Sequence, residues 1–308
     1  MICKECNQEF KSLGGLHTHI SKTHGMLLGA YYVTHFPRFN KLTGNPIPYK
    51  NYNQYLEEDF SDKKQLVKWC YRTPIEEVKQ YLLDLLRKRI LKKDLKSLPT
   101  TNELATINMM PSIFVFEDFF LHYQKVSDIL GLSIRLELEA KLPHYHRGDM
   151  EILIDTREQQ PLEFSNSRIL KLEFGDYTAA KDYYSKTFVE RKSMQDFIGT
   201  MSQGFERFCN EMERAANLNA YLYVVVDGTV EGTKKFHKFN AHQAKTSFIF
   251  SRMREIQQKY ANCQFVFSGG RDNSEKLIPK LLFYGPDAWG VDVQYFVEKT
   301  RLKVENIL

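Results

Sequence analysis

Residues 151–196 read EILIDTREQQPLEFSNSRILKLEFGDYTAAKDYYSKTFVERKSMQD, and this stretch decides the fold. Three short apolar runs in it, at 152–154, 170–174 and 187–189, are predicted strands. The charged or turn-forming residues that follow these runs are, in chain order, Asp155, Gly175, Asp176, Glu190, Arg191 and Lys192. Because strand side chains alternate between faces, Glu190 and Lys192 share one face. The stretch therefore predicts acids from three strands beside one lysine.

Clustered carboxylates of this kind need a neutralising cation. Neighbouring carboxylates raise each other's pKa, and hard oxygen ligands favour magnesium or manganese over zinc. A lysine beside such an ion can orient a water molecule or stabilise the charge that grows on a phosphate oxygen. This is a working arrangement for phosphodiester hydrolysis. The alternative is that each carboxylate only ends a strand and lies in water.

The spacing of these residues resembles one known family. The signature GDx(n)ERKxxxD of the XPF-type nucleases, with the DxRE motif that precedes it, corresponds here to Asp155-Thr156-Arg157-Glu158, Gly175-Asp176, Glu190-Arg191-Lys192 and Asp196. The resemblance covers roughly residues 150–285, about half of the chain. It implies a restriction-endonuclease-like α/β domain with a central mixed sheet that cuts DNA with a divalent metal.

The resemblance also implies roles for individual residues. Asp176 and Glu190 would be ligands of magnesium or manganese, and Lys192 would be the catalytic lysine. Asp155 and Glu158 would be supporting acids, with Asp155 also in the metal-ligand set. Arg191 would contact the scissile phosphate or hold the acids in place.

Composition and charge describe the rest of the chain. A length of 308 residues with 43% hydrophobic residues predicts two domains with real cores. No run of 18 apolar residues and no signal peptide is present, which predicts a soluble intracellular protein of the cytoplasm, or of the nucleus in a eukaryote. Residues 1–148 hold 21 Lys and Arg against 16 Asp and Glu, a net +5, whereas residues 149–308 hold 22 of each. The basic front half is expected to supply affinity for a polyanion.

A second motif occupies residues 1–25. The set Cys3, Cys6, His19 and His24 has the spacing C-x2-C-x12-H-x4-H, with apolar residues at Phe10 and Leu16. This spacing resembles a Cys-Cys-His-His zinc finger, in which four ligands surround one structural zinc ion. The base-reading positions would hold only small residues, so DNA docking with weak sequence preference is expected. Contact with a protein remains the alternative.

Two further regions precede the nuclease domain at 149–308. Residues 26–72 are predicted to be irregular, with aromatic rings that either stack on unpaired bases or close a small core. Residues 73–148 are predicted to be helical, either as a helix-turn-helix or as a plain helical linker. Basic residues predicted to contact DNA follow the first of these helices, with one more on a nuclease helix: Arg87, Lys88, Arg89, Lys92, Lys93 and Arg207.

Three readings of function follow. The first is a DNA endonuclease for branched or flapped DNA, with a role in repair or recombination. The second is a site-directed endonuclease of homing or phage type, in which the N-terminal half selects the sequence. The third is a DNA-binding protein without catalysis, against which the intact acids and Lys192 argue. The sequence leaves homodimer formation open.

Overall fold

A computed structural model describes residues 1–91, 96–139, 142, 150–180, 186–239 and 245–305 of the chain. The chain divides into two compact units. One holds Met1–Leu85 and Asn108–Phe120, and the other holds Leu86–Ile107 and Leu121–Leu308. None of the helices in the described ranges is both long and apolar enough to cross a lipid bilayer. The division into four domains at residues 25, 72 and 148 stays a prediction.

Short capped helices build the first unit. They are α1 (Leu13–Thr23), α2 (Leu28–His35), α3 (Tyr52–Glu57), α4 (Lys63–Cys70), α7 (Ile113–Phe120) and the part of α5 (Ile75–Leu91) up to Leu85. Asn51 and Asp62 cap α3 and α4 by accepting hydrogen bonds from backbone N–H groups three residues later. Residues 26–72 therefore contain three helices, and the prediction of an irregular region is wrong.

One apolar cluster joins the first 25 residues to the aromatic segment that follows. Its buried members are Cys3, Leu16, Ile20, Tyr31, Tyr32, Ile47 and Tyr55. The hydroxyl of Tyr31 accepts a hydrogen bond of 2.8 Å from the backbone N–H of Lys4. Tyr31, Tyr32 and Tyr55 are at most 3% exposed, so these rings close a core and are not available to stack on bases.

Two tight turns in this unit have the same form. Antiparallel bridges close them, from Ile2 to Glu9 in the first turn and from Phe39 to Pro46 in the second. Cys3 follows the first bridged residue of the first turn, and Asn40, which is 1% exposed, takes the equivalent place in the second. The Asn40 amide accepts from the N–H groups of Leu42 and Thr43 and donates to Ser61 and Gln65. The side chain of Asn40 thus fixes the second turn by hydrogen bonds, at the position that Cys3 occupies in the first turn.

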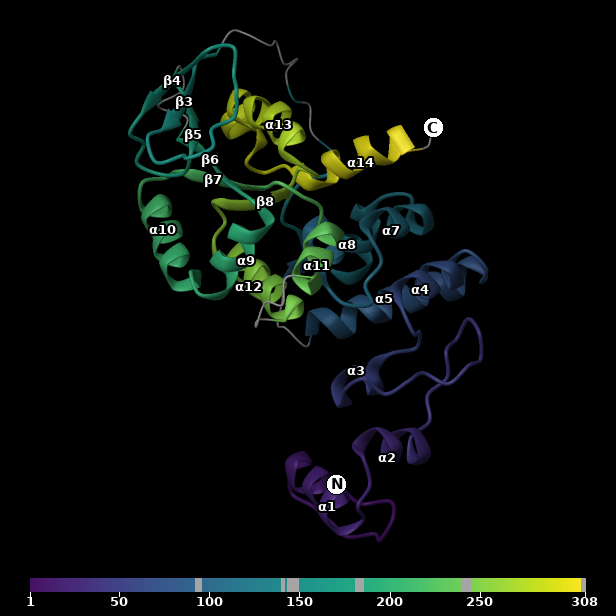
Figure 1. The fold of residues 1–308 in the computed structure, drawn as a ribbon. Coiled ribbons are helices and arrows are strands. Elements are labelled where there is room, and N and C mark those ends of the chain that lie inside the picture. Colours follow the sequence, from purple (N-terminus) through teal and green to yellow (C-terminus); the bar gives the residue numbers. More distant parts are fainter. Residues whose placement is uncertain (92–95, 140–141, 143–149, 181–185, 240–244, 306–308) are drawn as a thin grey trace. The chain divides into compact units, whose positions relative to one another are not determined.

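A six-stranded mixed sheet forms the centre of the second unit (Figure 1). Its strands are β3 (Ile152–Asp155), β4 (Ser167–Leu170), β5 (Tyr177–Ala179), β6 (Thr187–Lys192), β7 (Tyr221–Val226) and β8 (Cys263–Phe267), in the spatial order β4-β3-β5-β6-β7-β8. β5 is antiparallel to both neighbours, whereas the other pairs are parallel. Because β5 runs in the opposite direction, its first residue lies at the same end of the sheet as the last residues of β3, β6 and β7.

Helices cover both faces of this sheet. α9 (Met194–Ser202), α10 (Phe205–Asn217), α11 (Val230–Phe239) and α12 (Thr246–Lys259) pack on one face, against Leu222, Val224 and Val226 of β7. α13 (Arg271–Tyr284) and α14 (Val293–Glu305) pack on the other, against Tyr221, Tyr223 and Val225. Because adjacent residues of β7 are buried on opposite faces, the strand is apolar throughout. The predicted α/β class with a central mixed sheet, preceded by a mainly helical region, is confirmed.

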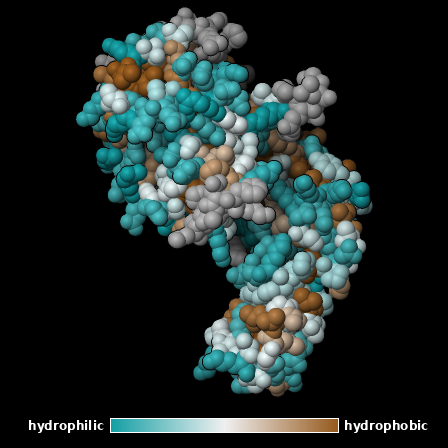
Figure 2. Space-filling view, in the orientation of Figure 1, coloured by the Kyte–Doolittle hydropathy of each residue, from teal (hydrophilic) through white to brown (hydrophobic). Residues whose placement is uncertain are grey.

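The two outer strands of the sheet differ in how their edges are covered. β4 is exposed along its length, with Ile169 67% and Leu170 41% exposed, and Figure 2 shows apolar surface at this end of the sheet. The edge of β8 is instead bonded to side chains. Asn102 of α6 (Thr101–Thr106) donates to the Phe265 carbonyl, and Gln294 of α14 accepts from the Phe267 N–H at 2.7 Å. Side chains thus satisfy backbone groups of β8 that an additional strand would otherwise pair.

Smaller elements complete the second unit. They are β1 (Ser97–Leu98), which pairs with β2 (Ser133–Ile134), α8 (Tyr123–Leu130) and the 3₁₀ helix η1 (Gly285–Ala288). The helix-turn-helix predicted within 73–148 stays a prediction.

The predicted strand at 170–174 is wrong. Only Leu170 belongs to a strand, because the N–H of Leu172 donates to the Asp155 carboxylate at 2.6 Å and the backbone leaves the sheet there. Leu172 and Phe174 are still buried, which explains their apolar character. Asp176 consequently lies at the start of β5 and not at the end of a strand.

Candidate active site

Asp176 is positioned by the backbone around it. Its N–H donates to the Val189 carbonyl at 2.8 Å, and its carbonyl accepts from the Asp155 N–H at 2.8 Å. The preceding residue must be glycine, because Gly175 has φ +57° and a Cβ there would lie 2.8 Å from the Val189 carbonyl oxygen. The Gly-Asp pair of the motif thus places one carboxylate between β3 and β6.

The three charged residues at the end of strand β6 point alternately to the two faces of the sheet. Glu190 and Lys192 lie on the face covered by α9 and α10, with Lys192 Nζ 2.7 Å from Glu190 Oε1. The Lys192 ammonium also lies 5.7 Å from the centre of the Phe208 ring of α10. The side chains of Lys192 and Glu190 are only 11% and 18% exposed. The predicted pairing of Glu190 with Lys192 on one face is therefore present as a largely buried ion pair.

Arg191 points to the opposite face and is surrounded by acids. Its guanidinium lies 2.9 Å from Asp227 and 3.6 Å from Glu158, and its side chain is 9% exposed. It also donates to the Gln160 carbonyl at 2.9 Å. Of its two proposed roles, this geometry supports holding the acids in place, since both terminal nitrogens of the guanidinium are paired and the side chain is largely buried.

Asp155 is engaged with its own loop. Its carboxylate accepts hydrogen bonds from the side chain and N–H of Arg157 and from the N–H of Leu172. Burial acts to raise the pKa of Asp155, but these hydrogen bonds outweigh it and hold the pKa below its ordinary value. Both oxygens are thus used to shape the turn after β3, which favours a structural role for Asp155 over the predicted one as a metal ligand.

The electrostatics of Asp176 differ from those of Asp155. Burial first, and then the neighbouring Glu190 carboxylate, raise the pKa of Asp176 to about 8. The N–H of Arg191, at 2.7 Å from Asp176 Oδ2, and the Lys192 ammonium oppose this rise only in part. A buried carboxylate beside another carboxylate is stabilised by a divalent cation. Asp176 and Glu190 therefore fit an oxygen-ligand site for magnesium or manganese, a metal that often binds through one or two carboxylates plus water and phosphate.

Two acids near this site were not singled out from the sequence as site residues. Asp227 follows β7 directly, and it pairs with Arg191 and accepts from the Ser274 hydroxyl. Asp227 follows an apolar run directly, as Asp155 does, so the same sequence pattern could have identified it. Glu211 of α10 has a pKa raised by burial and then by the Glu190 carboxylate, so it belongs to the same electrostatic group. An amphipathic helix gives no sequence signal for such a contact.

The four predicted zinc ligands come together in the first unit. Their ligand atoms, from Cys3, Cys6, His19 and His24, all lie within 4.8 Å of one another. Cys3 Sγ lies 3.6 Å from His24 Nε2, and Cys6 Sγ lies 3.2 Å from His19 Nε2. These separations and the two-thiol, two-imidazole donor set fit tetrahedral zinc. Among the described residues, no other group of three or more Cys, His, Asp or Glu side chains lies close enough together to hold a metal ion.

The described members of the predicted DNA-contacting set lie on two helices. Arg87 and Lys88 are exposed near the end of α5, Arg89 is half-buried there, and Arg207 is exposed on α10. Lys92 and Lys93 lie outside the described residues. Their roles stay predictions.

Comparison with known proteins identifies one domain. Residues 154–281 match the model of the ERCC4 domain. These residues are an ERCC4 domain. The match covers less than half of the 308 residues and includes Asp155, Asp176, the Glu190-Arg191-Lys192 segment and Asp227.

Two solved structures are similar to part of the chain. XPF from Aeropyrum pernix is 17% identical with a TM-score of 0.34, over 43% of this chain and 63% of that chain. XPF from Aeropyrum pernix in complex with DNA is 17% identical with a TM-score of 0.32, over 43% of this chain and 62% of that chain. The chain thus spans less than two thirds of either. No curated protein matches it.

Proposed function

We propose that the protein is a DNA endonuclease that hydrolyses phosphodiester bonds with magnesium or manganese. The observation that carries this proposal is the buried carboxylate of Asp176, with its raised pKa, beside the Glu190–Lys192 pair in an ERCC4 domain. A buried acid pair with one lysine suits phosphodiester hydrolysis because it combines a cation site with a donor for a phosphate oxygen.

Each residue of the site has a distinct task in this proposal. Asp176 and Glu190 would hold the divalent ion, which polarises the phosphate and activates a water molecule. Lys192, held beside Glu190, would donate to the phosphate oxygen on which charge develops. The ion pairs of Arg191 with Glu158 and Asp227 would tie the segments after β3 and β7 to β6, and Asp155 would fix the loop after β3.

Two variants test the active site. Asp176→Asn and Lys192→Ala should each lower the cleavage rate at least about a hundredfold, because each removes one charged group from the reacting centre. DNA affinity, measured by fluorescence anisotropy in Ca²⁺, should stay close to that of the unmodified protein. Lys171→Ala, an exposed lysine of the same domain, is the matched control and should cut normally. Full cleavage activity in Asp176→Asn would rule out this centre.

For the substrate, we propose branched or flapped DNA, with the zinc site and basic helices of the N-terminal half docking the duplex. A second candidate is site-directed cleavage of duplex DNA, which the compact first unit with its Cys-His site favours. A cleavage screen over flap, fork and linear duplexes separates them. Cutting at the branch regardless of sequence supports the first, and a single cut in one long duplex supports the second.

A further inference from the structure

The two tight turns of the first unit have the same backbone form, residue by residue. The first turn runs from Ile2 to Glu9 and the second from Phe39 to Pro46, so each position in the second lies 37 residues after its counterpart. The sixth residue of each turn has a positive φ, +62° at Asn7 and +68° at Gly44. Because few residues adopt this conformation, its presence at equivalent positions shows that the two turns follow one path.

Cys3 and Asn40 occupy the same position in this path. The backbone N–H of each donates to the carbonyl five residues later, at 2.9 Å in the first turn and 2.8 Å in the second. The carbonyl of each accepts from the N–H four residues later, at 2.8 Å in both turns. The side chain of each also accepts from the N–H groups two and three residues later. The Asn40 amide oxygen thus accepts the hydrogen bonds that the Cys3 sulfur accepts.

The correspondence continues outside the turns. The residue after each turn is apolar: Phe10 packs against the core of the first unit, and Ile47 is a buried member of it. His24 and Ser61 are also 37 residues apart. Cys3 Sγ lies 3.6 Å from His24 Nε2, and Asn40 Nδ2 lies 3.0 Å from Ser61 Oγ. A ligand pair of the Cys-His site therefore has a hydrogen-bonded pair as its counterpart.

Asn40 links the second turn to the start of α4. Its amide accepts two hydrogen bonds within the turn and donates two, to Ser61 Oγ at 3.0 Å and to Gln65 Oε1. Two donated and two accepted bonds are the full capacity of an amide side chain. A structural zinc ion likewise joins side chains from a turn to side chains from a helix, but it needs thiolate, imidazole or carboxylate ligands. Asn40, Thr43, Ser61 and Gln65 offer none of these.

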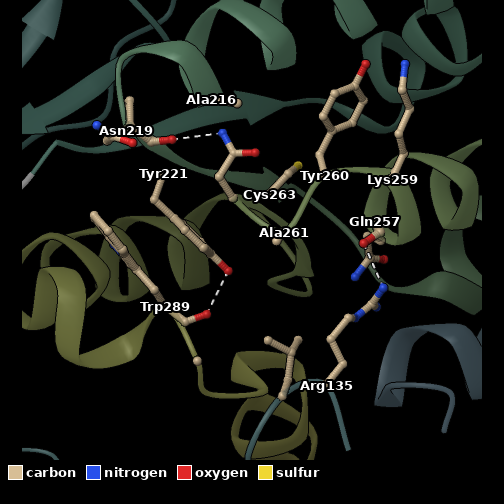
Figure 3. Close-up of a pocket in the computed structure, with 14 residues that line it drawn as sticks. Arg135, Ala216, Asn219, Tyr221, Gln257, Lys259, Tyr260, Ala261, Cys263 and Trp289 are labelled. Atoms are coloured by element: carbon tan, nitrogen blue, oxygen red, sulfur yellow. Dashed lines mark hydrogen bonds between the residues drawn. The ribbon is translucent and has the colours of Figure 1, made fainter. Parts of the chain in front are cut away.

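Polar side chains hold irregular backbone elsewhere in both units. Figure 3 shows two examples near the beginnings of β7 and β8, where Arg135 donates to the Gln257 carbonyl at 2.7 Å and Tyr221 donates to the Trp289 carbonyl at 2.9 Å. In the first unit, Arg38 precedes the second turn and donates to two carbonyls at the end of α3. Hydrogen bonds from side chains are thus a repeated means of fixing loops in this protein.

We propose that the second turn is a metal-site turn in which the Asn40 amide takes the place of the ion. Residues 38–65 would then be a metal-free counterpart of the Cys-His site, with a backbone frame that accepts a metal ion once zinc ligands replace the four polar side chains. This proposal is independent of the proposed cleavage reaction. It uses the Cys-His site as its geometric reference.

Cobalt binding to the full-length chain tests the frame. The variant with Asn40→Cys, Thr43→Cys, Ser61→Cys and Gln65→His should take up one more Co²⁺ ion than the unmodified chain, measured by the absorption of thiolate-bound Co²⁺ under reducing conditions. Asn45→Cys with Asn53→Cys adds thiols at exposed positions of the same unit and is the control, with no additional ion expected. Equal uptake by the folded fourfold variant and the unmodified chain would overturn the proposal. Because the difference is measured, a failure of the Cys-His site would appear separately, as a total lower by one ion.

Asn40→Ala tests the role of the amide without building a new site. In the presence of zinc, hydrogen exchange of the Gly44 and Ile47 N–H groups should accelerate at least about tenfold, because the turn loses the side chain that holds it. Exchange at Asn7 in the first turn and the number of bound zinc ions should not change. Asn53→Ala, at an exposed position of α3, is the matched control. Unchanged exchange at Gly44 and Ile47 in Asn40→Ala would refute the proposal even if the fourfold variant does not fold.

Discussion

At the scale of single residues, Asp155 and Asp176 show how the pKa of one type of side chain is shifted in opposite directions by its surroundings. Both lie at the end of the sheet where β3 and β6 finish, and both belong to motifs that can be recognised in the sequence. Asp155 accepts from Arg157 and Leu172 and its pKa falls, whereas Asp176 faces Glu190 and its pKa rises. The sequence predicts that these acids meet, but it does not show which hydrogen-bond donors the folded loop supplies.

The raised pKa of Asp176 predicts a pH-dependent stability in metal-free protein. Below pH 4 the carboxyl is protonated in both the folded and the unfolded state. Between its unfolded value of 3.8 and the folded value of about 8, only the unfolded state ionises. The free energy of unfolding should therefore fall with rising pH in this window, by up to about 1.4 kcal/mol per pH unit from this group.

Urea unfolding in EDTA at pH 5, 6, 7 and 8 measures this effect. Asp176→Asn removes the ionisable group, so its stability relative to the unmodified protein should increase steadily across the series. Asp128→Asn, which replaces an exposed acid of the same unit, is the control and should run parallel to the unmodified protein. A constant difference between Asp176→Asn and the unmodified protein would show that the carboxyl does not titrate in this window.

At the scale of elements, the covered edge of β8 makes a prediction about stability. Gln294→Leu leaves the buried Phe267 N–H without its acceptor, which should cost about 1–3 kcal/mol of unfolding free energy. Denaturant melts measure the loss. Gln195→Leu on α9 replaces an exposed glutamine and should change stability far less. Equal stability of Gln294→Leu and the unmodified protein would mean that β8 does not need this bond.

Elements were predictable from sequence where the signal was local. The runs around β3 and β6 predict strands correctly because they are apolar and are followed by charged residues. Contacts between distant segments, such as Asn102 on β8 or Glu211 near Glu190, depend on tertiary packing and leave no local pattern. The break between α9 and α10 at Gln203 and Gly204 is a tertiary feature of this kind, because both helices pack on the same face of the sheet.

At the scale of the whole molecule, the two compact units predict two separable unfolding events. Cys6→Ser removes one of the four side chains of the proposed zinc site, and the apolar cluster that includes Cys3 and Tyr31 would lose the metal proposed to hold its first turn. The first unit should melt earlier, while the unit that contains residues 154–281 keeps its melting temperature. Limited proteolysis during a thermal ramp resolves the two events. Lys22→Ser, at an exposed position of α1, is the control.

If both units of Cys6→Ser unfold at the same temperature, the prediction that they unfold independently is wrong. Equal protease resistance of residues 1–57 in Cys6→Ser and in the unmodified protein would contradict the role of the metal.

The core that joins the first 25 residues to the following segment also determines how short a fragment can be moved to another protein. Cys3, Leu16 and Ile20 pack against Tyr31, Ile47 and Tyr55, and the second turn is held by the amide of Asn40 without a metal ligand. A graft of the first 25 residues onto another protein would carry the Cys and His side chains of the proposed zinc site but leave behind most of the apolar residues that pack against them. The smallest portable module therefore ends after α3, near Glu57, and extends through α4 if the Asn40 bonds to Ser61 and Gln65 are to be kept.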